Sequence, residues 1–146
     1  MNRRVSWVYF CLGAVIYSLV AVFQSSPGYM DAEYYTATAL QLADGKGFQE
    51  PFIWNYLNQP AGIPAPSHLY WMPLASLLAA LGKIAGWGED FLRMRLPFVL
   101  AAALLAPAAV NIAQGLVREK RNAWLSGILA AFAGVYWIYL TLPETF

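Results

Sequence analysis

The sequence contains little charge, cysteine or histidine. Asp, Glu, Lys and Arg make up 12% of the 146 residues, about half of their share in an ordinary soluble domain. Cys11 and His68 are the only residues of their types, so the chain offers no disulfide framework and no pair of imidazoles for a zinc site. It also lacks a phosphate-binding glycine loop, a nucleophile elbow and a dinucleotide fingerprint. A net charge of +1 favours no nucleic-acid partner.

Hydrophobic residues, in contrast, make up 60% of the chain and gather in three long runs. A membrane-spanning helix needs about 20 mainly apolar residues, and runs of that length predict an all-α polytopic membrane protein. The first run follows Arg3 and Arg4. It is longer than the core of about 7–15 residues in a signal peptide, so we expect an uncleaved anchor, although Ser25-Ser26 leaves cleavage open. The predicted spans are about 5–24, 96–117 and 123–142.

The segment between the first two spans, residues 25–95, is predicted to be an outer loop with helices lying along the interface. Asp31–Ala43 reads as one such helix, with Gly45 placed to end it as a left-handed cap. The stretch Phe48–Pro66 contains four prolines and is expected to be an irregular loop.

The segment His68–Gly86 leaves two topologies open, because its length would just cross a bilayer. If it spans, the basic turn Arg118–Arg121 lies outside and Glu144 lies in the cytoplasm. If it does not, that turn is cytoplasmic and both Asp31 and Glu144 face outward. Each arrangement places five basic residues inside and four outside, so the positive-inside rule is nearly neutral. We favour three spans, because Pro73 interrupts the segment and the shortest loop is basic.

Three acidic residues are candidates for chemistry at the outer membrane face. Asp31 and Glu33 follow the first span, where a carboxylate could accept a proton from a hydroxyl or position a cation. An aspartate before an apolar helical run is also a preferred N-cap, and capping is the stronger expectation for Asp31 from spacing alone. Glu144 lies at the outer end of the third span, where an ionisable group suggests a function. A divalent cation is compatible with these acids, but the sequence assigns none.

Several other side chains are candidates for binding a substrate. Aromatic rings can stack on sugars, although they also gather at any bilayer interface. His68 could bind a phosphate or orient an acid, or it could be an ordinary interfacial histidine. Arg93 and Arg95 could neutralise a lipid phosphate, and snorkelling to the headgroups explains them equally well. The aromatic candidates are Tyr34, Tyr35, Trp54, Tyr56, Tyr70 and Trp71.

Three short motifs in order give a family resemblance. They are DAEYY from Asp31, LADGKGF from Leu42 and PSHLYWMPL from Pro66. Together they resemble the amino-terminal region of GT-C fold membrane glycosyltransferases, in particular the protein-mannosyltransferase and aminoarabinose-transferase-like branch. The resemblance extends over essentially the whole chain but corresponds only to the first part of such an enzyme.

The resemblance implies a catalytic acid in the first outer loop, then a Pro-Leu motif, then a second acid at the start of the next outer loop. Asp31 matches the first acid, Pro73-Leu74 the Pro-Leu motif and Glu144 the second acid. Many members carry an acid where Ala32 stands, which leaves Glu33 to substitute for it.

By this resemblance the expected function is transfer of a sugar from a polyprenyl-phosphate donor to an acceptor at the outer face of a cell membrane, with the N-terminus in the cytoplasm. The expected partners are the donor lipid, the bilayer and the remaining transmembrane helices of a longer chain. The 146-residue piece alone is expected to be inactive. The alternative is a noncatalytic membrane subunit or scaffold that binds lipid or partner helices. A transporter is disfavoured, because the spans contain almost no ionisable residues.

Overall fold

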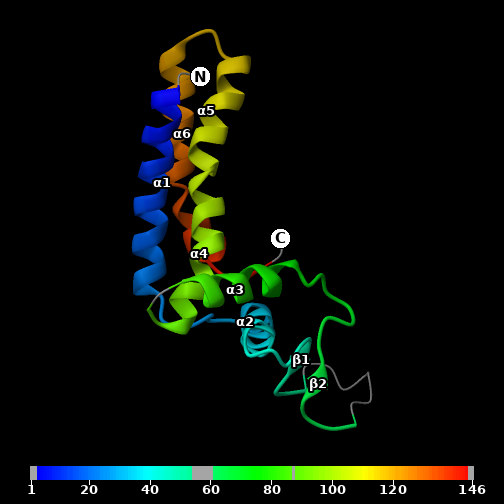
Figure 1. Cartoon of the computed structure of the whole chain (residues 1–146). Helices are drawn as coiled ribbons and strands as arrows, with labels where there is room; N and C mark the ends of the chain where they lie inside the picture. The colour runs from blue at the N-terminus through cyan, green and yellow to red at the C-terminus, as the bar shows by residue number, and fades with distance from the viewer. Residues whose placement is uncertain (1–2, 54–60, 87, 145–146) are drawn as a thin grey trace. The chain divides into compact units, whose positions relative to one another are not determined.

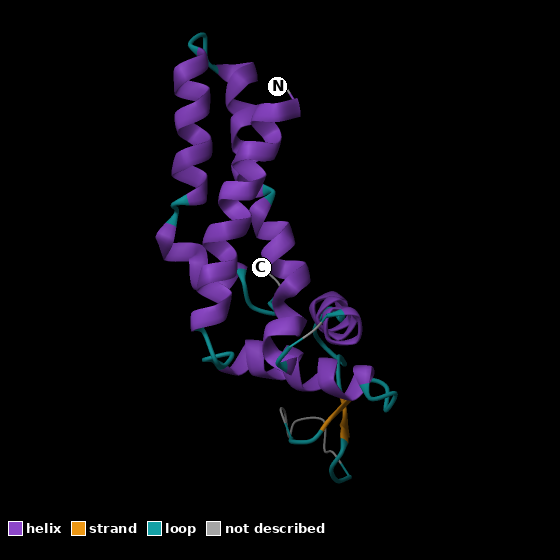
Figure 2. Cartoon of the chain, turned by 60° about the vertical axis from the view of Figure 1, so that its left-hand side comes forward, coloured by secondary structure: helices purple, strands orange, loops and turns teal. Residues whose placement is uncertain are grey.

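The computed structural model describes residues 3–53, 61–86 and 88–144. The chain divides into two compact units, which we call the first unit (Met1–Gln24 and Phe98–Thr141) and the second unit (Ser25–Pro97 and Leu142–Phe146). Regular structure is mostly helical, as predicted (Figures 1 and 2). The elements in order are α1 (Arg3–Phe23), α2 (Met30–Ala43), β1 (Gln49–Glu50), β2 (Ala65–Pro66), α3 (Leu74–Ala85), α4 (Asp90–Ala103), α5 (Leu105–Leu116), α6 (Lys120–Ala131), the 3-10 turn η2 (Gly134–Tyr136) and α7 (Trp137–Leu140).

The first unit is built around α1, α5 and α6, which pack against one another. Helices α5 and α6 run side by side as a hairpin and are joined by residues 117–119 (Figure 1). Small residues let the helices approach closely. A side chain at Gly127 would place its Cβ 2.3 Å from Val110, and one at Gly13 would place it 3.0 Å from the Ala103 carbonyl oxygen. Small-residue contacts of this kind are typical of helix packing in membranes.

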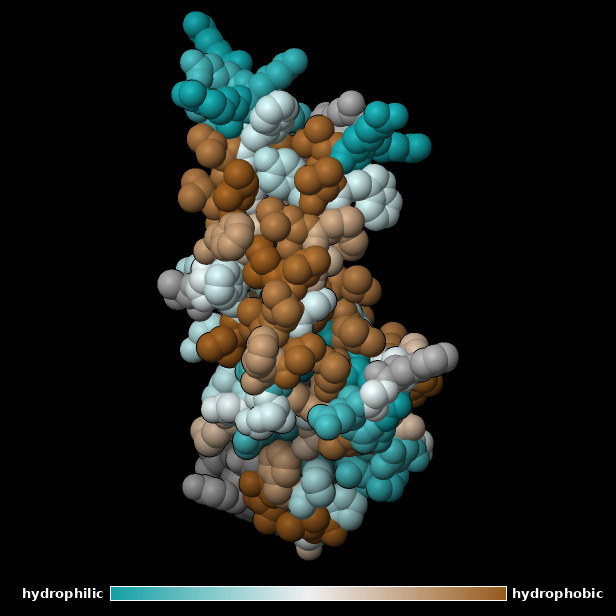
Figure 3. Space-filling model, turned by 90° about the vertical axis from the view of Figure 1, so that its left-hand side faces the viewer, coloured by the Kyte–Doolittle hydropathy of each residue, from teal (hydrophilic) through white to brown (hydrophobic). Residues whose placement is uncertain are grey.

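Two helical stretches are long and apolar enough to cross a membrane, Arg3–Phe23 and Asp90–Leu116. The second consists of α4 and α5 with a break at Leu104. Pro107 explains the break, because it has no N–H to donate to the carbonyl four residues earlier. Much of the face drawn in Figure 3 is brown, the colour of hydrophobic residues. Both stretches expose many large apolar side chains, including Val8, Val15, Leu19, Val22, Phe23, Leu100, Ile112 and Leu116.

The predicted third span, 123–142, is not one continuous helix. Helix α6 ends at Ala131, and η2 and α7 follow as separate short elements. Gly134, a poor helix former, lies just after the break. The Trp137 indole donates a hydrogen bond to the Ala131 carbonyl oxygen at 3.1 Å, which satisfies a backbone group that the helix end leaves open. Three spans therefore remain a prediction.

In the second unit, α2 packs against α3 and borders β1. The predicted helix over Asp31–Ala43 is confirmed to within one residue. Its predicted cap is also confirmed. Gly45 adopts a left-handed conformation with φ of 75°, its N–H donates to Leu42, and that of Lys46 donates to Gln41. This pair of hydrogen bonds is the Schellman arrangement, which closes the end of a helix.

The stretch predicted as an irregular loop contains a short antiparallel ladder that the prolines did not suggest. Gln49 pairs with Pro66, and Glu50 pairs with Ala65. Pro66 is tolerated because a proline can lie at the edge of a two-stranded pair. The ladder draws residues 49 and 66 together and fixes the start of the segment that contains His68.

Helix α3 has 12 residues, a length of about 18 Å at 1.5 Å per residue. Such a helix does not reach across about 30 Å of hydrocarbon. Gly82 brings it close to α4, where an added Cβ would lie 2.4 Å from the Arg93 carbonyl oxygen. That carbonyl cannot accept the usual bond from residue 97, because Pro97 has no N–H. That His68–Gly86 does not cross the membrane stays a prediction.

Candidate functional site

The three acidic candidates all belong to the second unit. Helix α2 begins at Met30 after Tyr29 as N-cap, and no side chain caps it. The expectation that Asp31 caps the helix is therefore wrong. Asp31 lies inside the first turn and is half-buried, and Glu33 in the same turn is exposed. Acids there are favoured by the helix dipole, but the Asp31 carboxylate is not committed to a capping bond.

Glu144 is held near the start of the same helix. The Tyr29 hydroxyl donates a hydrogen bond to a carboxylate oxygen of Glu144, across 115 positions of sequence. Tyr29 lies two residues before Asp31. The structure thus brings the second predicted acid to the N-terminal end of the helix that carries the first.

His68 is the centre of an aromatic cluster formed with one face of α2. Its ring stacks on Tyr35 at 5.7 Å between centroids, meets Tyr34 edge-on at 5.2 Å and meets Phe48 edge-on at 5.6 Å. The backbone N–H of His68 donates to the Tyr34 hydroxyl. Because residues three and four apart lie on one face of a helix, Asp31 shares this face with Tyr34 and Tyr35.

Both nitrogens of the His68 ring have partners. Nδ1 lies 3.1 Å from the Trp71 carbonyl oxygen, and Nε2 lies 2.9 Å from Ser76 Oγ. A carbonyl only accepts, so Nδ1 carries a proton and donates it. Burial lowers the pKa of the imidazole, and the bond to Trp71 acts in the opposite direction. The Ser76 hydroxyl donates its single proton to the Tyr35 carbonyl oxygen at 2.9 Å, and its oxygen is the polar partner of His68 Nε2. His68 therefore fastens its loop to α2 and α3 and leaves no free nitrogen for a phosphate.

The predicted aromatic ligands separate into buried and exposed groups. Tyr34 and Tyr35 are buried and form part of the core, whereas Tyr70 is 66% exposed and Trp71 is 36% exposed. Trp71 also packs edge-on against Tyr34 at 5.2 Å. Tyr70 and Trp71 are the described aromatic candidates whose side chains are exposed. Trp54 and Tyr56 lie outside the described residues.

The two predicted arginines each have an intramolecular role. Arg93 pairs with Asp90 and keeps 24% of its side chain exposed. Arg95 is fully buried, with its guanidinium 5.0 Å from the centre of the Phe91 ring. Lys83 connects neighbouring elements by ion pairs with Asp44 at 2.9 Å and Asp90 at 3.7 Å. Of the two arginines, Arg93 is the one that could still meet an external anion.

Glu50 is a buried acid that the sequence did not single out. It is 5% exposed, and its Oε2 finds no hydrogen-bond partner among the described residues. Burial raises the pKa of this carboxyl to about 7, because the charged form loses its hydration. No sequence pattern pointed to Glu50, because its burial follows from its pairing with Ala65 in the ladder.

Tyr29 and Ser76 were also missed. Each acts through a contact between residues far apart in the chain, Tyr29 with Glu144 and Ser76 with Tyr35, and neither belongs to a pattern with a fixed spacing. Within residues 3–53, 61–86 and 88–144, no three His, Cys, Asp or Glu side chains are grouped to hold a metal ion.

Comparison with known proteins gives no relative. No family model matches this sequence, and no curated protein or solved structure matches it.

Proposed function

We propose that this chain is the amino-terminal part of a membrane glycosyltransferase that transfers a sugar from a polyprenyl-phosphate donor to an acceptor at the outer membrane face. The observation that supports this most is the hydrogen bond from Tyr29 to Glu144. This bond ties Glu144 to a residue two positions before Asp31, which is compatible with a site of two cooperating acids. The proposal also rests on the three motifs that follow one another in the sequence.

In this proposal Asp31 is the general base. It takes the proton of the acceptor hydroxyl while the hydroxyl oxygen attacks the anomeric carbon of the sugar. The bond from that carbon to the phosphate oxygen breaks, and the polyprenyl phosphate leaves with the electron pair. Glu144 and Glu33 support the acceptor, and Tyr70 and Trp71 stack on a sugar ring. Arg93 is the better candidate to neutralise the charge on the departing phosphate, because its side chain is partly exposed and Arg95 is buried.

Asp31→Asn in the full-length protein tests the proposal. The amide keeps the size of the side chain but has no useful basicity, so transfer from a polyprenyl-phosphate sugar should fall by about a hundred- to ten-thousand-fold. Expression and helical content should stay close to wild type, because Asp31 makes no capping bond that the change would break.

Two further variants make the result specific. Glu33→Gln tests the other acid of the same turn, and Glu89→Gln removes an exposed acid that has no role in the proposal. Transfer by Asp31→Asn within a few-fold of wild type would remove Asp31 as the base. Equal losses in Asp31→Asn and Glu89→Gln would point to a general charge effect.

The proposal also requires the turn between α5 and α6 to be cytoplasmic. Three basic residues, Arg118, Lys120 and Arg121, should resist translocation. In a background with Cys11 replaced by Ser, Asn122→Cys should react with a membrane-impermeant thiol reagent only after the cells are opened. Labelling of intact cells would reverse the hairpin and place Glu144 on the wrong side.

A further inference from the structure

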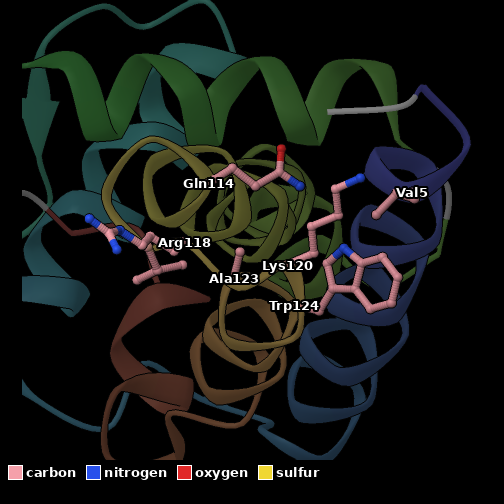
Figure 4. Close-up of a pocket in the computed structure, with 7 residues that line it drawn as sticks. Val5, Gln114, Arg118, Lys120, Ala123 and Trp124 are labelled. Carbon is pink, nitrogen blue, oxygen red and sulfur yellow. The ribbon is translucent and has the colours of Figure 1, made fainter.

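The basic turn of the first unit contains a hollow that the proposed function does not use. Its volume is about 450 Å³, and it is lined by the start of α1, the end of α5 and the start of α6. Figure 4 shows the Gln114 amide and the Lys120 ammonium group extending toward the side of Val5, whereas the Arg118 guanidinium extends the other way. Val117, Ala123 and Trp124 complete the wall.

The chemistry of this hollow favours an anion. Lys120 supplies a full positive charge, and Gln114 supplies two N–H donors. Helix α6 begins at Lys120, and its N-cap Glu119 makes no side-chain capping bond, so the positive end of the helix dipole adds to the charge of Lys120. Neither Lys120 nor Arg118 takes part in the ion pairs found among the described residues.

A second hollow indicates that the anion belongs to a lipid. It has a volume of about 520 Å³, and its wall is mostly apolar, with Trp7 and Phe10 from α1 facing Leu104 and Pro107. It also contains Asn111. Positions 107, 111 and 114 are three or four residues apart, so they follow one stripe of α5. One turn of helix along that stripe leads from Asn111 in the apolar hollow to Gln114 in the polar one.

We propose that the polar hollow binds the phosphate headgroup of an anionic phospholipid, with an acyl chain lying along the apolar hollow. Lys120 and Gln114 hold the phosphate, and Trp124 lies at the level of the glycerol backbone, a usual place for an indole. Basic pockets between membrane helices are known to select such headgroups. The site is structural or regulatory and is separate from the acids of the second unit.

The test measures lipid binding to the purified full-length protein in detergent. Phosphatidylglycerol and phosphatidylcholine are titrated separately, and the bound lipid is counted by native mass spectrometry. Phosphatidylglycerol should bind at least about tenfold more tightly than phosphatidylcholine. Lys120→Gln should weaken phosphatidylglycerol binding by about tenfold, as expected for loss of a charge-assisted hydrogen bond. Arg121→Gln removes the same charge from the same turn but does not line the hollow, and it should change binding by less than about twofold.

Val5→Phe provides a variant without a change of charge, since the larger ring fills the hollow and should also weaken binding. Inorganic phosphate added in excess should not displace the lipid, because it cannot use the apolar hollow. Equal losses in Lys120→Gln and Arg121→Gln would overturn the site in favour of diffuse attraction. Equal binding of both lipids, displacement by inorganic phosphate, or unchanged binding in Val5→Phe would each overturn it as well.

Discussion

The two units of this chain solve different physical problems. The first unit packs helices through small residues, with Gly13, Gly127 and several buried alanines at the contacts, and it exposes large apolar side chains. The second unit contains the ion pairs found among the described residues, the aromatic cluster around His68 and the three acidic candidates. Its buried groups include the polar side chains of Glu50 and Ser76.

This difference indicates where each unit derives its stability. Close contact of backbones is useful where lipid removes the hydrophobic drive for association. Hydrogen bonds and ion pairs with defined geometry are useful where side chains must be oriented for chemistry. The first unit is therefore suited to be an anchor and the second to hold a site. Substitutions that act in one unit and not in the other can test this division.

The largest expected effect is the pH dependence of the second unit through Glu50. Its pKa rises from 4.5 to about 7 in the folded protein, so the folded state binds more protons than the unfolded state between these values. Stability is then fully present below about pH 4.5 and is lost as pH rises through about 7. The loss amounts to about 3 kcal/mol at 1.36 kcal/mol per unit.

Glu50→Gln should remove this dependence and leave the second unit more stable than wild type at pH 8. Hydrogen exchange measured by mass spectrometry, corrected for the intrinsic effect of pH, follows peptides of each unit separately. Peptides of the first unit should respond little, and an equal response in both units would remove the proposed division. A wild-type second unit with flat stability from pH 5 to 8 would show that Glu50 is paired or hydrated.

The next effect tests small-residue packing in the first unit. Gly127→Ala places a Cβ 2.3 Å from the Val110 side chain and 2.7 Å from the Tyr9 ring, so these side chains must shift or the helices must separate. We expect a loss of about 1–3 kcal/mol, as for other overpacked contacts. Gly115→Ala is the matched control, since nothing lies within 4 Å of its added Cβ, and it should stabilise α5 by about 0.5–1 kcal/mol. Denaturation in mixed micelles measures both. Similar stabilities of the two variants would show that α6 does not approach its neighbours this closely.

Sequence reasoning was most successful where the pattern is local. The helix over Asp31–Ala43 and its Gly45 cap follow from periodicity and from the backbone freedom of glycine, and both are confirmed. The third span stays a prediction, because the apolar run 123–142 is broken near Gly134 and the Trp137 indole bonds the end of α6. Hydropathy alone does not record such a break.

The candidate site was predictable only in part. The acids could be named from their places beside apolar runs, but their partners could not. The bond between Tyr29 and Glu144 joins residues 115 positions apart, and the burial of Glu50 depends on a ladder of two residues per strand. Contacts of this kind arise from tertiary packing, which has no signature within a short window of sequence.

The smallest expected effect tests whether polar geometry holds the second unit together. Ser76 is fully buried, and its hydroxyl lies 2.9 Å from both His68 Nε2 and the Tyr35 carbonyl oxygen. Ser76→Ala removes the hydrogen bond to the Tyr35 carbonyl oxygen and leaves the half-buried His68 Nε2 without its polar partner. The cost should be about 1–2 kcal/mol, since an unsatisfied buried polar group is more costly than an absent one.

Ser67→Ala is the matched control one residue before His68. The Ser67 hydroxyl is also buried, but it has no hydrogen-bond partner among the described residues. Its removal should therefore change stability by less than about 0.5 kcal/mol, or should stabilise the unit slightly. Both variants lose the same oxygen from a buried serine, so the difference between them isolates the hydrogen bonds from the loss of volume. Hydrogen exchange in the peptide containing residues 67–76, measured at increasing temperature, gives this difference. If both variants lose the same stability, packing and not the hydrogen-bond network holds the His68 loop, and the second unit resembles the first more than its polar contacts suggest.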